Sequence, residues 1–421
     1  MNKQKMVLCI LISLVMLFGA GKSSEAAPSV SGISGNLSNG SQITISGNGF
    51  GTKPQAAPLI SSYDHPVGSY NFADEGAGTV AYSASPNIPW YNAYRTTMNR
   101  VNSAPLRTGL YQSSIKVSYD PANIGGTDYH PLGYNHDLAD RYAYISWWMY
   151  RDYSTWNQWS TSGANTKFFR LWTGQTNPRL MTAFAHRTDA LGNPDCLSDG
   201  GDGLGSYYDG TGIFGYGWNI DYSACGAVAY MRGMYSPTTG NSSCMGMLKE
   251  WEHWELFYDL GTNFAASTPG TDGRAIIFKN GKTIADTSHI QWSQTGELNT
   301  NRIYLVGQVT GGRTVTGGNE YLDQVYIDNS MSHVFLSDKS DLTNWARNSS
   351  AYHSEIQVPS NWSNNSLTFT LNQGSFTNGQ QAYLYVVDAN GNINSSGYPI
   401  TIGASGEDTI APSAPGGLMV K

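Results

Sequence analysis

The chain has 421 residues and a formal net charge of −7, and only 13% of its residues are charged whereas 12% are aromatic. An acidic chain argues against nucleic acid and against anionic membrane surfaces as partners, because like charges repel. The 48 glycines, 27 tyrosines and 12 tryptophans favour a β-protein with many turns, and the length is enough for two or three domains.

Residues 1–26 have the pattern of a secretory signal peptide. Lys3 and Lys5 precede an apolar run over residues 6–19, and Ser24-Glu25-Ala26 supplies small residues at the spacing of a cleavage site. The apolar run is too short to span a membrane comfortably. We therefore expect an exported protein without a membrane span, either secreted or periplasmic. Its mature chain has a net charge of −9, because the removed segment carries three lysines and one glutamate.

Beyond the signal peptide, alternation of apolar and polar residues predicts strands and no helix. Residues 247–261 start with helix-compatible residues but alternate like a strand from Trp254 onward. The dipeptide Asn280-Gly281, favoured in type I′ turns, predicts a hairpin over residues 273–286. Other strands are expected at 141–152, 166–174, 179–187, 289–292, 301–309 and 320–329. Many short strands joined by Gly/Asn turns indicate an all-β fold, an antiparallel β-sandwich or jelly roll.

Three segments at the two ends of the chain belong together. They are ITISGNGFG (43–51), WSNNSLTFTL (362–371) and YLYVVDANGNINS (383–395). In this order they resemble an IPT/TIG immunoglobulin-like module whose halves are separated by roughly 300 residues. The resemblance implies one small Ig-like β-sandwich, formed by residues 28–60 and 350–403, with a whole domain inserted at residues 61–337. Insertion at an exposed loop tip is structurally tolerated.

The insert contains four characteristic segments: ISWWMYRD (145–152), KFFRLW (167–172), WEHWELFYDL (251–260) and DGRAIIFKNGKTI (272–284). Their rhythm resembles concanavalin-A-like lectin/glucanase jelly rolls, including polysaccharide-lyase-like and laminin-G-like sandwiches. The resemblance implies a jelly roll that faces carbohydrate. Residues 408–421 resemble the start of a fibronectin type III module but are too few to fold, so we expect residues 404–421 to be a disordered tail.

Aromatic residues and one arginine mark a candidate carbohydrate-binding face. In a strand, Phe168, Arg170 and Trp172 lie on one side. An arginine between two aromatic residues suits a groove in which rings stack on sugars and the guanidinium pairs with carboxylates or hydroxyls. On the strand at 141–152, Trp148 and Tyr150 belong to the more polar face. The alternative, that such tryptophans fill the interface between two sheets, stays open.

A catalytic alternative rests on His289 and Gln291, which share a strand face. They are similar to the polar pair of alginate-lyase-like jelly rolls, although the order is reversed. The resemblance implies that Arg170 and Gln291 neutralise a uronate carboxylate, while His289 or a tyrosine such as Tyr304 removes a proton, as β-elimination requires. An ordinary solvent-facing histidine also explains His289.

Metal and disulfide candidates lie in the middle of the chain. The loop NPDCLSDGGDG (193–203) carries Asp195, Asp199 and Asp202, whose oxygens are the ligands that Ca²⁺ prefers. This calcium ion is the only cofactor that the sequence indicates. Export favours one disulfide, but the pairing stays open among the three mature cysteines Cys196, Cys225 and Cys244.

Two hypotheses for function follow. The first is a non-catalytic protein that binds polysaccharide through an aromatic-lined sheet groove, with cell-surface or matrix components as further candidate partners. The second is a polysaccharide lyase acting on a uronate polymer. A glycoside hydrolase is disfavoured, because Glu250, Glu252 and Glu255 do not form the ExDxxE pattern of the related glucanases. The residues alone do not decide whether the protein is an enzyme.

Overall fold

The computed structural model describes eighteen segments of the chain: residues 27–53, 55–62, 80–81, 90–93, 96–101, 105–107, 114–119, 130–136, 141–152, 165–173, 180–186, 204–206, 251–262, 272–290, 301–306, 308–310, 318–347 and 350–404. In these segments every element is a β-strand except one short 3-10 helix, η3(Trp345–Arg347). The predicted all-β fold class is therefore confirmed. In the described part of the chain, no helix is long and apolar enough to cross a membrane.

The two ends of the chain form one sheet of seven strands, which we call the frame. Its order is β1(Ser29–Ser34), β2(Gln42–Asn48), β21(Ser366–Thr370), β20(Ser354–Trp362), β19(His333–Ser337), β22(Gln381–Val387) and β23(Tyr398–Thr401). The long-range contact is the antiparallel pair β2–β21, in which Ile43 lies opposite Phe369 and Ile45 opposite Leu367. Strands from the two ends of the chain therefore belong to one sheet.

The frame folds into two layers around its own core. Ile43, Ile45, Leu367 and Phe369 from β2 and β21 are fully buried, and they meet Leu384 and its neighbours from the second layer. β20 contributes to both layers, because it pairs with β21 and with β19 and has a register shift between its two ends. Such an irregularity bends a strand and lets it pass from one layer to the other.

One predicted boundary was wrong. The insert was expected to extend to residue 337, but β19(His333–Ser337) pairs with β20 and β22 in the frame. Alternation predicts a strand at this position without indicating which sheet it joins. Both faces of β19 are buried: Val334 and Leu336 enter the frame core, whereas Phe335 points the other way.

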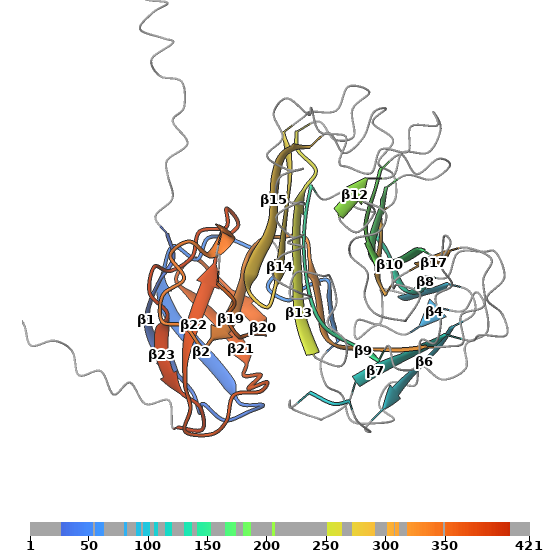
Figure 1. The fold of residues 1–421 in the computed structure, drawn as a ribbon. Helices are drawn as coiled ribbons and strands as arrows, with labels where there is room; N and C mark the ends of the chain where they lie inside the picture. Colours follow the sequence, from blue (N-terminus) through green and yellow to red (C-terminus); the bar gives the residue numbers. More distant parts are fainter. Residues whose placement is uncertain are drawn as a thin grey trace, which may run out of the picture.

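The insert consists of two antiparallel sheets. The inner sheet, beside the frame, has the order β15(Lys282–Ile290), β14(Gly273–Lys279), β13(Trp251–Asp259), β9(Tyr142–Asp152), β18(Gly318–Asp328), β7(Ser114–Tyr119) and β6(Thr96–Val101), and β3(Ile60–Ser62) pairs with β18. The outer sheet has the order β12(Leu204–Ser206), β11(Leu180–His186), β10(Asn165–Thr173), β16(Asn301–Val306), β8(His130–His136), β5(Trp90–Ala93) and β4(Val80–Ala81), and β17(Gln308–Thr310) pairs with β10. Figure 1 shows β8 and β10 on the side of the inner sheet that is opposite the frame.

A second apolar cluster joins the frame to the inner sheet. Tyr144, Phe257 and Phe278 of the inner sheet pack with Phe335 and Tyr385 of the frame. The intervening residues Ile145, Trp147, Trp254, Leu256 and Tyr258 are also at most 1% exposed. Because successive residues of a strand point to opposite faces, both faces of the inner sheet are buried at β9 and β13.

The predicted Asn280-Gly281 hairpin is present between β14 and β15, and it contacts the frame. Both residues have positive φ, 50° and 73°, as a type I′ turn requires. A side chain at Gly281 would lie 2.5 Å from the ring of Tyr352, and the Tyr352 amide donates to the Asn280 carbonyl at 2.9 Å. β15 continues to Ile290, so His289 belongs to this hairpin and not to the separate strand expected at 289–292.

The β2–β21 pair makes the stability of the strands near residue 370 depend on residues 42–46. Ile43→Ala removes a fully buried side chain from the frame core and is expected to lower the free energy of unfolding by about 2–5 kcal/mol. Gln42→Ala, at the exposed neighbouring position, should change it by less than about 0.5 kcal/mol. Urea unfolding followed by tryptophan fluorescence measures both, and equal effects of the two variants would contradict the shared core.

Candidate functional site

The outer sheet brings two of the predicted site residues together. Arg170 of β10 and Tyr304 of β16 are direct cross-strand partners, and Trp172 lies opposite Arg302 in the same pair of strands. Residues two apart in a strand share a face. One face therefore has four adjacent positions, occupied by Arg170, Trp172, Arg302 and Tyr304. The two arginines lie diagonally across the strand pair from each other, and so do Trp172 and Tyr304.

The same face continues onto β8 and β5. Gly133 of β8 lies opposite Tyr304, and Asn135 lies opposite Arg302. Tyr91 of β5 is in turn the partner of Gly133. Across the four strands, the row of cross-strand partners is Arg170, Tyr304, Gly133 and Tyr91. Gly133, which has no side chain, thus lies between the two tyrosines. We call this face, with its neighbouring row of Trp172, Arg302 and Asn135, the arginine face.

The alternate positions of the same strands include a polar row, in which Thr173 pairs with Asn301 and Asn301 with His136, and a more apolar row. Leu171 of β10 pairs with Ile303 of β16, and Ile303 pairs with Tyr134 of β8. Arg302 and Asn135 were not among the residues selected from the sequence. The signal for Arg302 was its spacing two residues before Tyr304, which places both on one strand face.

The third predicted residue of β10 has a different position. Phe168 falls at the register shift between Lys167 and Phe169 in the pairing of β10 with β11. A register shift interrupts the regular alternation of faces at that residue. Arg170 and Trp172 therefore share a face by regular pairing, and Phe168 lies where that pairing is broken.

Trp148 lies at the joint between the insert and the frame, and not on an open groove. Its side chain is 7% exposed, and the Arg107 guanidinium lies 3.6 Å from the centre of one of its rings. On the same strand face, Ser146 is fully buried, and half-buried Tyr150 packs edge-on against Tyr321 at 5.9 Å. The expectation that this face of β9 lines a groove is corrected. Alternation separates two faces of a strand but does not indicate what covers either of them.

The catalytic set expected for a lyase is divided between the sheets. His289 lies on β15, the edge strand of the inner sheet, whereas Arg170 and Tyr304 lie in the middle of the outer sheet. Gln291, the calcium candidates Asp195, Asp199 and Asp202, and the cysteines Cys196, Cys225 and Cys244 fall outside the described residues. Among the residues that the structure describes, no group of three His, Cys, Asp or Glu side chains could hold a metal ion.

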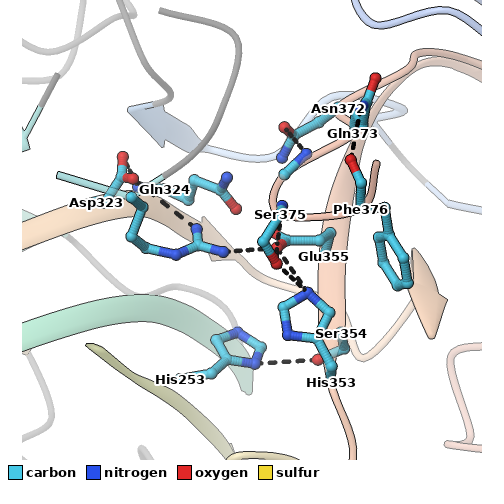
Figure 2. A network of polar contacts seen from close by, with 12 residues as sticks. His253, Asp323, Gln324, His353, Ser354, Glu355, Asn372, Gln373, Ser375 and Phe376 are labelled. Atoms are coloured by element: carbon cyan, nitrogen blue, oxygen red, sulfur yellow. Dashed lines mark hydrogen bonds and ion pairs between the residues drawn. The ribbon is translucent and has the colours of Figure 1, made fainter. Parts of the chain in front are cut away.

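Buried charges cluster at the joint beside Trp148. Arg107 of the insert donates to Glu355 of β20 at 2.6 Å, and both side chains are at most 4% exposed. Glu355 also accepts from the Ser375 amide at 3.0 Å and contacts His353 Nε2 at 2.8 Å, as Figure 2 shows. Burial by itself raises the pKa of Glu355, but Arg107 and His353 outweigh it and hold the pKa at about 2.

Gln324 completes this network from β18. With its amide oxygen turned toward Arg107, it accepts from Nη1 at 3.0 Å and donates to Glu355 Oε2 at 3.0 Å. Gln324 has a φ of 47° and lies within the register shift of β18, which is a strained conformation for a residue with a side chain. The bulge thus directs a polar side chain to a buried ion pair.

His253 and Glu255 are neighbours on the same face of β13. His253 bridges the two units, with Nε2 2.8 Å from Ser146 Oγ and Nδ1 3.0 Å from Ser354 Oγ. Burial lowers the pKa of His253 to about 3, so it is neutral at physiological pH. Glu255 accepts a hydrogen bond from Tyr144 at 2.5 Å, but burial outweighs that bond and raises the pKa of Glu255 to about 7.

Ser375, His353 and Glu355 contain the residue types of a nucleophilic triad but not its geometry. Ser375 Oγ and Glu355 Oε1 both lie 2.8 Å from the same atom, His353 Nε2. A triad requires the serine and the carboxylate on different ring nitrogens, so that one nitrogen accepts the serine proton while the other is oriented. A nitrogen that donates to Glu355 cannot accept from Ser375. This cluster belongs to the joint and has no catalytic arrangement.

No family model and no curated protein matches the chain. Solved structures to which the chain is similar include a double mutant of the alginate lyase Aly36B in complex with alginate trisaccharide, with 17% identity and a TM-score of 0.37 over 64% of this chain and 98% of that chain. They also include the endo-β-1,4-glucuronan lyase from the fungus Trichoderma reesei, with 10% identity and a TM-score of 0.34 over 62% and 95%. The carbohydrate recognition domain of Emp46p in its potassium-bound form has 12% identity and a TM-score of 0.28 over 60% and 87%. At these TM-scores the similarity assigns no residue role to this chain.

The buried Glu255 predicts a pH-dependent effect of one substitution. Its pKa is raised from 4.5 to about 7, so the folded protein keeps a proton that the unfolded chain releases, and stability is lost as the pH rises through this range. Glu255→Gln cannot ionise. Relative to the wild type, its free energy of unfolding should increase by up to about 3 kcal/mol between pH 4.5 and 7, at about 1.4 kcal/mol per pKa unit. Urea unfolding at both ends of this range measures the difference, and a difference independent of pH would contradict the buried neutral carboxyl.

Proposed function

We propose that this protein binds a polysaccharide through the arginine face of the outer sheet. The observation that supports the proposal is the register of β10 and β16, which makes Arg170 and Tyr304 direct partners beside Trp172 and Arg302. Diagonal positions in an antiparallel pair are about 7–8 Å apart. Two guanidinium groups and two aromatic rings at that spacing suit a chain of sugars.

The preferred ligand is an acidic polysaccharide such as a uronate polymer. A guanidinium pairs with a carboxylate through two parallel hydrogen bonds, whereas a neutral sugar offers only hydroxyls. The mature chain has a net charge of −9 and repels a polyanion at long range. Recognition of an acidic polymer therefore depends on the local pair of arginines, and binding without them is unfavourable.

The remaining expectations from the sequence form part of this proposal. An exported protein would meet extracellular polysaccharides, and cell-surface or matrix components remain candidate partners. The frame is proposed to be the IPT/TIG-like module, and the insert the concanavalin-A-like jelly roll. In this arrangement the frame covers the inner sheet and leaves the outer sheet available to ligand.

A second candidate function, polysaccharide lyase, is favoured by Tyr304 opposite Arg170 and by Asn135 opposite Arg302. In β-elimination, groups such as Arg170 and Asn135 would stabilise the charge that develops on the uronate carboxylate. Tyr304 would take the C5 proton, the electron pair would form the C4=C5 double bond, and the glycosidic C4–O bond would break as its oxygen gains a proton. Non-catalytic binding requires fewer groups and is the preferred function.

Binding to acidic polysaccharide should depend on Arg302. Arg302→Ala is expected to weaken the affinity for alginate or polygalacturonate roughly tenfold to a hundredfold, the usual contribution of a hydrogen bond to a charged group. Arg302→Lys should recover only part of it, because lysine keeps the charge but not the planar fork. Lys339→Ala removes an exposed positive charge from the frame and is the matched control. Affinity electrophoresis compares the variants, and the proposal fails if neither Arg302→Ala nor Arg170→Ala weakens binding.

Turnover separates the two candidate functions. Incubation with alginate, glucuronan and pectin should leave the ultraviolet absorbance unchanged, because binding alone forms no unsaturated product. A rise in absorbance that disappears in Tyr304→Phe, while binding persists, would instead establish the lyase. Loss of such activity in His289→Ala would require that β15 also contributes to the site, which the sheet order does not favour.

A further inference from the structure

The frame carries no charged side chain over most of its length. Residues 27–52, 356–387 and 389–404 contain no Asp, Glu, Lys or Arg. The exposed surface of a soluble domain usually consists of about a quarter or more of these residues. The long uncharged stretches include all of β1, β2, β21, β22 and β23.

The three charged residues that border or interrupt these stretches are buried. Lys53 is ion-paired with Asp328 of the insert, and both side chains are at most 2% exposed. Glu355 is buried against Arg107. Asp388 is 1% exposed and accepts three hydrogen bonds within its own turn, from the Asn390 amide and from the amide and side chain of Asn392.

The outward positions of β1, β2, β21 and β20 form a regular array of hydroxyl and amide groups. One row reads Ser34, Thr44, Thr368, Asn361, and Thr44 Oγ1 lies 3.0 Å from Thr368 Oγ1. The neighbouring rows contain Ser46 opposite Ser366 and Gln42 opposite Thr370. We call this array the hydroxyl face. Its side chains are exposed or half-buried, whereas the alternate residues Ile43, Ile45, Leu367 and Phe369 fill the frame core.

The hydroxyl face is the part of the frame farthest from the joint. β19 and β22 lie between it and the insert, because they contribute one face to the frame core and the other to the joint cluster. Figure 1 shows β1, the edge strand of this face, on the side of the frame away from β14 and β15. Edge strands are commonly protected by charged side chains, and β1 has none.

The chemistry of this face restricts the partner. A charged partner would find no countercharge, and an apolar partner would bury hydroxyls without hydrogen bonds, which is unfavourable. A partner that offers many hydroxyls can exchange hydrogen bonds with Ser, Thr, Asn and Gln, each of which both donates and accepts. A charge on this face would oppose such contact, since an uncharged polymer cannot compensate its desolvation.

We propose that the hydroxyl face binds an uncharged, hydroxyl-rich polysaccharide. This surface is separate from the arginine face and does not depend on the function proposed for it. The two faces lie at opposite ends of a stack of four layers, with β19 and β22 and the inner sheet between them. A protein with both faces could hold an acidic and a neutral polysaccharide at once. A polysaccharide surface that offers many binding sites would strengthen weak individual contacts through avidity.

The test uses the full chain and three insoluble neutral polysaccharides: cellulose, chitin and β-1,3-glucan. The wild type should be retained on at least one of them in about 1 M salt, because contact between uncharged groups is not screened. Gln42→Glu with Ser46→Asp places two charges on the hydroxyl face and should reduce retention at least tenfold. Gln381→Glu with Ser396→Asp adds the same charges at exposed positions on β22 and before β23, and should leave retention unchanged. Circular dichroism confirms that each variant is folded.

Three results would overturn the proposal: no retention on any of the three polymers, an equal loss in the control variant, or a loss in Arg170→Ala with Arg302→Ala. The last result would assign neutral polymers to the arginine face. Light scattering over a range of concentrations detects the competing occupant, a second copy of the chain. Self-association abolished by Gln42→Glu with Ser46→Asp would therefore also overturn the proposal.

Discussion

The burial of both faces of the inner sheet is the constraint on which the rest of the structure depends. A sheet between two layers has no solvated side, so every polar group on either face needs a partner inside the protein. On the face toward the frame, Ser146 and His253 bond to each other, and Tyr144 donates to Glu255. The frame satisfies the same rule with Glu355, whose charge is balanced by Arg107. Neither unit can leave the other without exposing apolar rings and separating a buried ion pair.

A buried ion pair contributes less to net stability than its distance suggests, because removing both charges from water offsets much of the attraction. The stronger effect of the ion pair is on the orientation of the frame relative to the insert. Arg107 and Gln324 reach Glu355 from two different parts of the insert, so the hydrogen bonds are complete only when the frame and the insert meet in one relative position. The low pKa of Glu355 comes from Arg107 and His353, which outweigh burial, whereas the low pKa of His253 comes from burial itself. Both pKa values depend on the assembled joint and return toward their ordinary values in the unfolded chain.

Local pattern was sufficient to predict the strands, the Asn280-Gly281 turn and the pairing of ITISGNGFG with the end of the chain, because each depends on alternation or on turn residues. It was not sufficient to predict which layer covers a strand. Trp148 was expected on a groove and lies under Arg107, although the segments that contain them are far apart in sequence. Arg170 and Tyr304 were selected separately, and only the register of β10 and β16 makes them neighbours. Arg302 joins this group through the same pairing of β10 and β16. The pairing of two strands cannot be predicted from the sequence of either strand alone.

The layered arrangement also determines where ligands can bind. At β9 and β13 the frame side of the inner sheet is occupied by buried rings, and the other face is buried as well, so these strands offer no open face to a polymer. The two sheet faces that we propose for binding differ in composition. The arginine face concentrates positive charge in an acidic protein, whereas the hydroxyl face has no charge at all. Since the joint fixes the orientation of the frame to the insert, the two proposed faces belong to different units that are held in one relative position.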